Sequence, residues 1–272
     1  MHGAGNDFVV IDARAGGGSI LTPALVRALG DRHRGVGFDQ LAELTYALGA
    51  DVGVAFWNAD GSTSAACGNA TRCIAAMLLE EGHGPALAIE VAGRGRLAAR
   101  ARDDGLIEVD MGPPALGWRE VPLAEEVDTR ALPLPREPVA LSMGNPHCVH
   151  FVDDLDAIDW LAEGRAVECH PLFPERTNVQ FVEVIDHETV RARVWERGVG
   201  PTLASGSSAC AIAVAGHRRG LTARRVSVAL EGGVLDIEWR ESDGHVLMAG
   251  PVASVFEGRL SPGFLAAVEA GA

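Results

Sequence analysis

Cys67 has the setting of a reactive thiol, because it lies in a polar, glycine-flanked turn where a loop becomes a helix. A short apolar run over residues 52–56 predicts a preceding strand, and residues 74–81 predict the body of the helix. Backbone N–H groups at a helix start have no partner within the helix, and the helix dipole favours negative charge there. The sequence therefore predicts that Gly68 and Asn69 bind a carboxylate and that Cys67 is biased toward the thiolate.

The second half of the chain repeats this pattern around Ser205. A strand-like run over residues 190–194 leads to a glycine-rich turn, in which Ser205 is followed by Gly206 and Ser207. An apolar helix follows and ends at Gly216. The repeat predicts two related half-molecules that face each other, each directing a helix start at one substrate.

The other cysteines favour packing over metal binding. None of the five cysteines forms a CxxC pair, so the spacing predicts no metal site. Cys73 and Cys210 fall inside apolar helix runs, and Cys148 leads into an apolar strand, so we expect all three to be buried. The neighbouring His147 has two interpretations: an ordinary turn histidine, or an acid–base partner beside a thiol and a carboxylate.

The composition is that of a soluble globular protein with room for one large or two ordinary domains. The 272 residues are 47% hydrophobic and 22% charged, and the net charge of −14 argues against nucleic-acid or acidic-membrane surfaces. No apolar run approaches the roughly 18–20 residues of a membrane span, and the first residues lack the features of a signal peptide. We therefore expect a cytoplasmic protein without nucleic-acid or membrane partners.

The chain contains no lysine, and its 23 basic residues are all arginines. A pyridoxal enzyme holds its cofactor through a lysine Schiff base, and a Walker-type phosphate loop also needs a lysine. The sequence excludes both arrangements, and we expect no cofactor.

Apolar runs punctuated by glycine turns predict a strand-rich α/β chain with one central helix in each half. Further strands are expected at residues 8–12, 41–48, 86–91, 96–110, 139–143, 175–181, 224–230, 233–240 and 245–249. Shorter helices are expected at residues 22–29, with Thr22 as the N-cap, and at residues 155–163.

The boundary between the halves is expected at the Met-Gly-Pro-Pro sequence of residues 111–114. The first domain then spans residues 1–114 with 252–272, and the second spans residues 115–251. Residues 115–138 are rich in proline and acidic side chains, which predicts a connection with edge strands.

Together these features resemble the diaminopimelate epimerase family, within the cofactor-independent amino-acid racemases and epimerases. The matching blocks are HGAGNDF at residues 2–8, RGVGFDQ at 34–40, NADGS at 58–62, CGN at 67–69, GNPH at 144–147, ERTN at 175–178, ERGVG at 196–200 and GP at 250–251. Each block is weak by itself, but their order across almost the whole chain is highly specific.

The resemblance implies two pseudo-symmetric α/β domains, each a curled mixed or antiparallel sheet around a central helix, with the active-site cleft between them. It implies interconversion of LL- and meso-diaminopimelate, on the route to lysine and peptidoglycan, and a homodimer. In this family one cysteine thiolate removes the α-proton and a second thiol delivers one from the opposite face. The two helix starts would stabilise the charge that builds on the carboxylate.

The resemblance also assigns roles to individual residues. Cys67 matches the first catalytic cysteine, and His147 and Glu196 match polar partners that would bind the α-ammonium and help set thiol protonation. The remaining substrate contacts would come from the helix starts, Gly68, Asn69, Gly206 and Ser207, and from Asn6, Gln40, Asn58, Asn145, Asn178 and Arg197. Arg197 would bind the distal carboxylate in a bidentate manner. The alternative is that each asparagine is a turn or cap residue and that Arg197 is a surface charge.

Ser205 departs from the family pattern, which has a cysteine at this second catalytic position. A serine hydroxyl is a far weaker acid than a thiol and needs an adjacent base. Three explanations remain open: an engineered Cys→Ser change, a natural serine that relays a proton, and a divergent member with one-base chemistry, as in related hydroxyproline dehydratases.

Two other functions follow from these alternatives. One is a racemase or dehydratase for a smaller amino acid, against which the distal asparagine and arginine set argues. The other is a non-catalytic amino-acid-binding protein, which the presence of Cys67, His147 and Glu196 disfavours.

Overall fold

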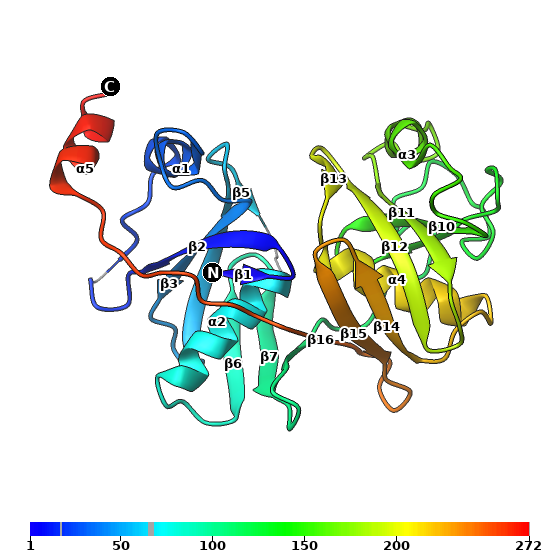
Figure 1. Ribbon diagram of the computed structural model, residues 1–272, viewed down its shortest axis with the longest axis horizontal. Coiled ribbons are helices and arrows are strands. Elements are labelled where there is room, and N and C mark those ends of the chain that lie inside the picture. Colours follow the sequence, from blue (N-terminus) through cyan, green and yellow to red (C-terminus); the bar gives the residue numbers. More distant parts are fainter. Residues whose placement is uncertain (17, 65–67, 272) are drawn as a thin grey trace. The chain divides into compact units, whose positions relative to one another are not determined.

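The computed structural model describes residues 1–16, 18–64 and 68–271 and has the mixed α/β architecture that the sequence predicts. The chain forms two compact units, Met1–Ile107 with Val252–Ala272, and Glu108–Pro251. Each unit is a mixed sheet with a 13-residue helix packed against it (Figure 1).

The sheet of the first unit has the strand order β1-β2-β3-β4-β6-β7, with β5 paired to β4. The strands are β1 (His2–Gly3), β2 (Asn6–Asp12), β3 (Gln40–Thr45), β4 (Val52–Asn58), β5 (Thr63–Ser64), β6 (Ala86–Val91) and β7 (Gly95–Ala101). The pairs β2/β3 and β4/β6 are parallel, because helices α1 (Pro23–Gly30) and α2 (Gly68–Glu80) provide the crossovers. The other pairs are antiparallel.

The chain passes into the second unit through β8 (Ile107–Asp110). The second sheet has the order β16-β15-β14-β12-β11-β10-β9, with β13 paired to β12. Its strands are β9 (Val139–Ser142), β10 (Pro146–Val152), β11 (Asn178–Val184), β12 (Thr189–Glu196), β13 (Gly200–Thr202), β14 (Arg225–Leu230), β15 (Gly233–Trp239) and β16 (Val246–Gly250). Helices α3 (Trp160–Glu168) and α4 (Gly206–Arg218) provide the crossovers for the parallel pairs β10/β11 and β12/β14.

The two units share one topology, which explains the repeat in the sequence. The antiparallel pairs β1/β2, β3/β4, β4/β5 and β6/β7 correspond to β9/β10, β11/β12, β12/β13 and β14/β15. The parallel pairs correspond in the same way, and α2 and α4 follow equivalent short strands. Equivalent residues of the two halves can therefore be identified from their places in the strands.

Helix α4 is the centre of the second unit. It contacts β9, β10 and β11 on one side of the strand order and β14, β15 and β16 on the other, so the sheet curls around it (Figure 1). Its buried residues from Ser208 to Gly216 are mostly small, which lets strands approach it closely from several directions. Cys210 is fully buried there, as are Cys73 in α2 and Cys148 in β10, which confirms the packing role expected for these thiols.

The predicted N-cap of α1 is confirmed, because the Leu25 amide donates to Thr22 Oγ1 at 3.2 Å. The predicted start of the next short helix is wrong, because α3 begins at Trp160 and not at residue 155. Asp159 is its N-cap and accepts a hydrogen bond from the Ala162 amide, whereas the Leu155 amide donates to the Glu183 side chain.

Two further features differ from the sequence-based expectation. The described residues of 115–138 form turns and a single bridge, Ala115 to Ser142, and not edge strands; instead, apolar side chains such as Val121 and Leu132 pack into a core cluster. Helix α5 (Pro262–Glu269) was not predicted. It begins at the N-cap Ser261 and contributes Phe264 and its neighbours to the apolar cluster around α1.

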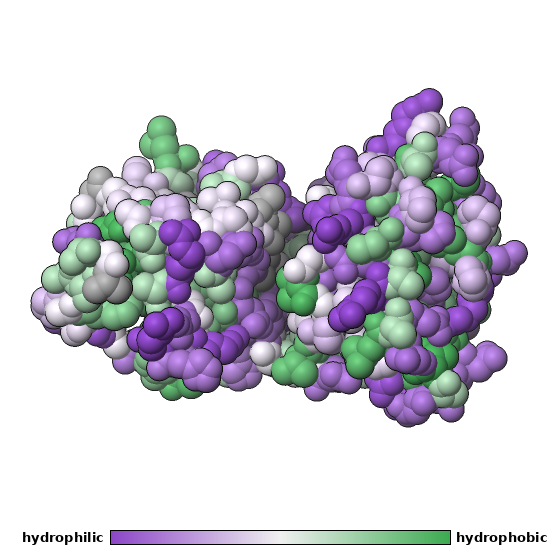
Figure 2. Space-filling model, turned by 90° about the horizontal axis from the view of Figure 1, so that it is seen from above, coloured by the Kyte–Doolittle hydropathy of each residue, from purple (hydrophilic) through white to green (hydrophobic). Residues whose placement is uncertain are grey.

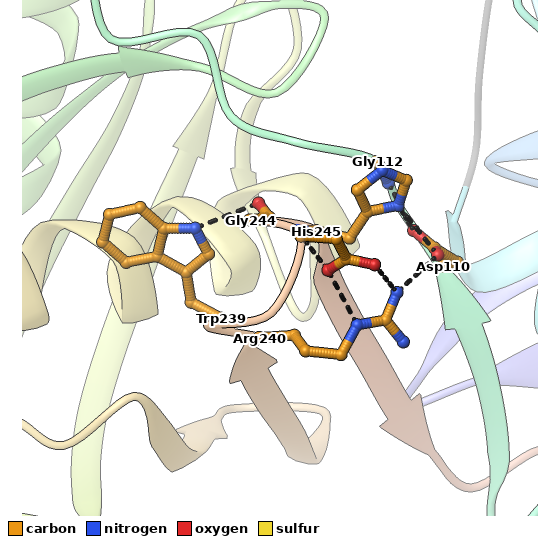
Figure 3. Close-up of polar contacts among 7 residues, drawn as sticks. Asp110, Gly112, Trp239, Arg240, Gly244 and His245 are labelled. Carbon is orange, nitrogen blue, oxygen red and sulfur yellow. Dashed lines mark hydrogen bonds and ion pairs between the residues drawn. The ribbon is translucent and has the colours of Figure 1, made fainter.

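A polar cluster joins the end of β8 to the β15–β16 turn within the second unit (Figure 3). His245 Nδ1 lies 2.8 and 2.9 Å from the two Asp110 carboxylate oxygens, and the Gly112 amide donates to the same carboxylate. Arg240 contacts Asp110 at 3.5 Å and pairs with Asp243. These contacts are local to β8 and the turn, and they include none of the predicted site residues.

The surface is predominantly hydrophilic on the face shown in Figure 2, with hydrophobic residues lying between polar ones. Among the described residues, the most exposed large hydrophobic side chains are Leu48, Tyr46 and Val199. Within residues 1–16, 18–64 and 68–271, every helix is too short or too polar to cross a membrane.

Candidate active site

The first unit places Asn6 through a tight hairpin between β1 and β2. Ala4 and Gly5 have φ values of 51° and 81°, so the two-residue connection takes a turn in which both central residues have positive φ. Gly3 allows β1 to lie close to α2, because a Cβ at this position would be 3.1 Å from the Arg72 guanidinium. Arg72 is itself fully buried in α2.

A hydrogen-bonded network holds the Asn6 side chain. Asn6 Nδ2 donates to Asp39 Oδ2 at 2.7 Å, and Asn69 Nδ2 donates to Asn6 Oδ1 at 3.1 Å. Arg32 pairs with both Asp7 and Asp39, and its hydrogen bond to Asp7 is the main cause of the lowered pKa of that carboxyl. The predicted residues Asn6 and Asn69 are thus in direct contact, and Arg32 and Asp39, which were not predicted as site residues, support them.

Gln40 and Asn58 also lie together, because they are register partners at one end of β3 and β4. Gln40 Nε2 donates to Asn58 Oδ1 at 3.1 Å, and Asn58 Nδ2 donates to Ser62 Oγ at 3.0 Å. Asp60 accepts hydrogen bonds from the amide and hydroxyl of Ser62 and so fixes the turn after β4. Asn58 can therefore be a turn residue and a substrate contact at the same time.

The predicted catalytic residue Cys67 lies outside the described residues. Helix α2 begins at the next residue, Gly68, and both Gly68 and Asn69 are buried at its start. Asn69 Oδ1 is a buried acceptor with no hydrogen-bond partner among the described residues. The described part of the site therefore retains an unused polar atom beside the helix start.

Ser205 is the N-cap of α4, which begins at Gly206, directly after Ser205 as the sequence repeat predicts. Its backbone is extended, with φ −138° and ψ 119°, and its carbonyl accepts from the Ala209 amide at 3.0 Å. Among the described residues its side chain caps no amide of α4, although serine usually does so at this position. The N–H groups of Gly206 and Ser207 are thus left without a side-chain cap, which is the condition for anion binding at a helix start.

Asn145 and His147 lie beside the start of α4 and are linked to it by hydrogen bonds. His147 Nε2 lies 2.9 Å from Asn145 Oδ1, and Asn145 Nδ2 lies 3.4 Å from Ser207 Oγ. Behind them, Gln180 Nε2 donates to His147 Nδ1 at 3.0 Å and to Ser208 Oγ at 3.0 Å. The predicted residues are therefore part of one network that continues into the core.

His147 is fully buried, and desolvation is the first cause that lowers its pKa to about 3, followed by the positive charge of Arg197. The imidazole is neutral at physiological pH, and both of its ring nitrogens have hydrogen-bond partners. This environment supports a role for His147 in hydrogen bonding at the site.

Asn178, Glu196 and Arg197 lie at the adjoining ends of β11 and β12. The Arg197 amide donates to Asn178 Oδ1 at 3.0 Å, and the exposed Arg197 side chain contacts the Glu175 carbonyl at 3.2 Å. The buried carboxylate of Glu168 holds the next turn, because it accepts from Trp195 Nε1 at 2.7 Å and from the Gly198 amide at 2.8 Å.

The predicted polar residues of the two halves occupy equivalent places. Gln40 opens β3 and Asn58 closes β4, just as Asn178 opens β11 and Glu196 closes β12. Cys67 immediately precedes α2 in the sequence, as Ser205 precedes α4.

Sequence reasoning missed Gln180 and Glu168. No motif singles them out, and their roles depend on partners brought close by folding. Gln180 carries one usable signal, a polar residue inside an otherwise apolar strand.

A model of the family described as diaminopimelate epimerase matches residues 1–117 and 139–255 of this chain. A diaminopimelate epimerase from Acidiphilium cryptum is 51% identical over 98% of this chain and 96% of its own length. Another from Rhodospirillum centenum is 49% identical, over 96% of this chain and 91% of its own length.

Solved structures share the fold at low sequence identity. A phenazine biosynthesis protein of the PhzF family from Bacillus anthracis is 16% identical, with a TM-score of 0.64 over 92% of this chain and 91% of its own. A hydroxyproline epimerase from Agrobacterium vitis, solved with bound trans-4-hydroxy-L-proline, is 16% identical, with a TM-score of 0.63 over 92% of this chain and 86% of its own. The matches at about half identity over nearly the full length, the family model and the shared fold agree that this chain belongs to the diaminopimelate epimerase family.

Proposed function

We propose that this chain is a cofactor-independent isomerase that interconverts LL- and meso-diaminopimelate, with Cys67 as the base and Ser205 in place of the second acid–base residue. The observation that carries the proposal is the equivalence of the two halves. Each half contributes polar side chains from the ends of two paired strands, together with the start of one helix. In the first half the helix follows Cys67 in the sequence, and in the second half its start has no side-chain cap. Two such half-sites suit a reaction in which a proton leaves one face of a carbon and another proton arrives at the opposite face.

The chemistry follows from the weak acidity of the α-carbon. In the forward step the Cys67 thiolate takes the α-proton and becomes a thiol, and the C–H electron pair is left on the substrate. That charge spreads onto the substrate carboxylate, where the amides of Gly68, Asn69, Gly206 and Ser207 would stabilise it. A proton from the opposite face then completes the inversion, and this is the step for which Ser205 must serve.

Ser205 limits this second step. Its hydroxyl is a much weaker acid than a thiol, and an alkoxide is not available near neutral pH without an adjacent base. We therefore expect this chain to exchange the α-proton at one face faster than it inverts the centre. Further contacts to diaminopimelate would come from Asn6, Gln40, Asn58, Asn145, Asn178 and Arg197. Several of these, Arg197 above all, would bind its distal end.

Proton exchange in heavy water, followed by NMR, tests the proposal. LL- and meso-diaminopimelate are incubated separately with this chain, with Ser205→Cys and with Cys67→Ala as the inactive control. We expect Ser205→Cys to raise the rate of inversion by about 10²–10⁴-fold, the usual contribution of a positioned acid–base group. Rapid inversion by the unaltered chain would contradict the assignment of Ser205 as impaired. If no form exchanged or inverted diaminopimelate, while one of them did so with proline or histidine, the proposed substrate would be wrong.

The resemblance to the family further supports a cytoplasmic homodimer that acts in lysine and peptidoglycan synthesis. Sedimentation at micromolar concentration tests the oligomeric part of this proposal, and a monomer under these conditions would refute it. Loss of the gene product should likewise create a requirement for meso-diaminopimelate in a cell that depends on this chain.

A further inference from the structure

Gln180 is a buried polar residue that the proposed chemistry does not use. It lies on β11 with no exposed surface, and its side chain points to the start of α4 and to β10. Its amide nitrogen has two acceptors, His147 Nδ1 and Ser208 Oγ, both at 3.0 Å. A fully buried amide that contacts the histidine of the candidate site raises the question of what it fixes there.

The contact determines where His147 carries its proton. An amide NH₂ group can only donate, so His147 Nδ1 must be the acceptor in this contact. The proton of the neutral imidazole then lies on Nε2, which donates to Asn145 Oδ1 at 2.9 Å. With its oxygen occupied, Asn145 directs its own NH₂ group towards Ser207 and the start of α4.

The reversed arrangement is less favourable. If the Gln180 amide were rotated by half a turn, its oxygen would accept from His147 and from Ser208, and its NH₂ group would take the present place of Oε1. That place offers no hydrogen-bond partner among the described residues. The reversal would bury two unpaired N–H donors in place of one unpaired acceptor, which is the costlier outcome.

We propose that Gln180 is a positioning residue: by donating to Nδ1 it holds His147 in the Nε2-protonated form, which orients the Asn145 amide with its NH₂ group towards the substrate. His147 and Gln180 are buried, whereas Asn145 and Ser207 are partly exposed, so the chain of contacts runs from the core to the surface of the site. The part of this inference that concerns the substrate rests on the proposed function, and the part that concerns the tautomer does not.

The orientation has a chemical consequence for recognition. An outward NH₂ group on Asn145 suits a carboxylate or another acceptor, whereas an outward carbonyl oxygen would suit an ammonium group. Gln180 therefore sets which kind of group Asn145 can bind, although it touches no substrate itself.

The first test is the tautomer of His147 in the unaltered chain. Two-bond ¹H–¹⁵N spectra of protein labelled at histidine distinguish protonated from unprotonated ring nitrogens, and His147→Asn identifies the His147 signals by their loss. We expect the proton on Nε2 throughout the range from pH 5 to pH 9. A proton on Nδ1 would overturn the proposal without the need for any variant of Gln180.

Gln180→Met is the matched variant, because methionine has a similar length and no amide donor. We expect it to populate the Nδ1-protonated form and to weaken diaminopimelate binding about fivefold to tenfold, as the loss of one oriented hydrogen bond would. Ser208→Ala is the control, because it removes the other acceptor of the amide and should leave the tautomer unchanged. A Gln180→Met protein that keeps the Nε2 proton and full affinity contradicts the proposal.

A second variant covers the case in which Gln180→Met does not fold. In Gln180→Glu a carboxylate replaces the donor, so the proton should move to Nδ1 of His147, and an unchanged tautomer would again contradict the proposal. Calorimetry with the unaltered chain separates the two hypotheses. Failure to bind diaminopimelate refutes the proposed substrate, whereas the tautomer spectra still decide the role of Gln180.

Discussion

A hydroxyl at position 205 differs from a thiol mainly in acidity. The surroundings of Ser205 do not make its hydroxyl as acidic as a thiol. Ser205 is 6% exposed at the start of α4. Among the described residues, its hydroxyl makes no capping hydrogen bond to the amides of this helix. A helix start favours an anion, but the field of one helix shifts a pKa by far less than the gap between a hydroxyl and neutral pH. In the proposed mechanism, the difference in acidity between the two catalytic positions therefore comes from this one residue.

The cysteines should differ sharply in reactivity. Cys73, Cys148 and Cys210 are fully buried, and burial raises the pKa of the Cys73 thiol to about 11, so these side chains present little thiolate and no access. We expect iodoacetamide to modify Cys67 and the exposed Cys169 in the native protein, and to modify the buried three only in urea. Peptide mass spectrometry measures the extent of modification at each position.

Diaminopimelate provides the control for this experiment. It should slow modification of Cys67 and leave Cys169 unaffected, because only Cys67 belongs to the proposed site. Rapid native modification of Cys73 or Cys210 would contradict the assignment of these residues to the core.

Two buried histidines should make the protein less stable in acid. Burial lowers the pKa of His147 to about 3 and that of His150 to about 4, both below the ordinary value of about 6.5. Between these values the unfolded chain binds a proton that the folded chain does not, so the free energy of unfolding falls as pH decreases below about 6.5. The expected slope is up to about 1.4 kcal/mol per pH unit for each histidine.

Urea unfolding between pH 7 and pH 5 measures this slope. His150→Leu removes one of the two titrating groups and should reduce the slope by up to about 1.4 kcal/mol per pH unit. The control is His33→Leu, at an exposed position, which should leave the slope unchanged. Equal slopes for the unaltered chain and His150→Leu would show that His150 does not resist protonation in the folded state.

At the scale of elements, local sequence accounts for most strands and for the helices with clear caps. The strands β6, β14 and β15 fall within a residue or two of their expected positions because glycine turns and apolar runs mark both ends. The helix α3 was misplaced because residues 155–159 have a helix-like composition, while tertiary contacts of Leu155 and the Asp159 cap set the actual start.

The candidate site divides in the same way. Asn6 and Asn58 could be singled out as candidates because they lie in family blocks beside turns, and Ser205 because its surroundings repeat those of Cys67. Gln180 and Glu168 could not, because Gln180 acts on a residue 33 positions away and Glu168 on one 27 positions away. Their contacts exist only after β10, β11, β12 and α3 have packed together.

Glu168 should control the geometry of the turn that carries Arg197. Glu168→Ala leaves the Trp195 indole N–H and the Gly198 amide without their acceptor. We expect a loss of about 1–3 kcal/mol in the free energy of unfolding, because the buried indole N–H of Trp195 and the amide of Gly198 lose their acceptor. Binding of diaminopimelate should weaken as well, since Arg197 would no longer be held in one place.

Urea unfolding followed by intrinsic fluorescence measures the first effect, and calorimetric titration with diaminopimelate measures the second. Glu163→Ala is the matched control, because Glu163 lies on the same helix and its pairing with Arg136 is on the surface. It should change stability by less than about 1 kcal/mol and leave affinity unchanged. If Glu168→Ala bound diaminopimelate as well as the control, Glu168 would have no part in the geometry of the turn.

At the scale of the whole molecule, the two units have the same topology but different continuity in the chain. The second unit is formed by one continuous segment, whereas the first needs the C-terminal residues from Val252 onwards. His2 and Ala253 exchange two backbone hydrogen bonds of 2.9 Å, so the last segment pairs with β1 beside the hairpin that carries Asn6. The segment from Val252 onwards therefore completes the first unit beside β1.

This dependence predicts a local response to a change in α5. Phe264 is partly buried against the cluster of Leu25, Leu29 and their neighbours, whereas Phe256 is 67% exposed. Phe264→Asp places a charge against that apolar cluster, so α5 should detach and the amides of α1 should exchange faster. The helix α4 should keep its protection, because it belongs to the continuous second unit.

Hydrogen exchange read by mass spectrometry measures both helices, with Phe256→Asp as the control that should alter neither. Equal loss of protection in α1 and α4 would mean that the two units unfold as one, and that the C-terminal segment supports both halves of the molecule.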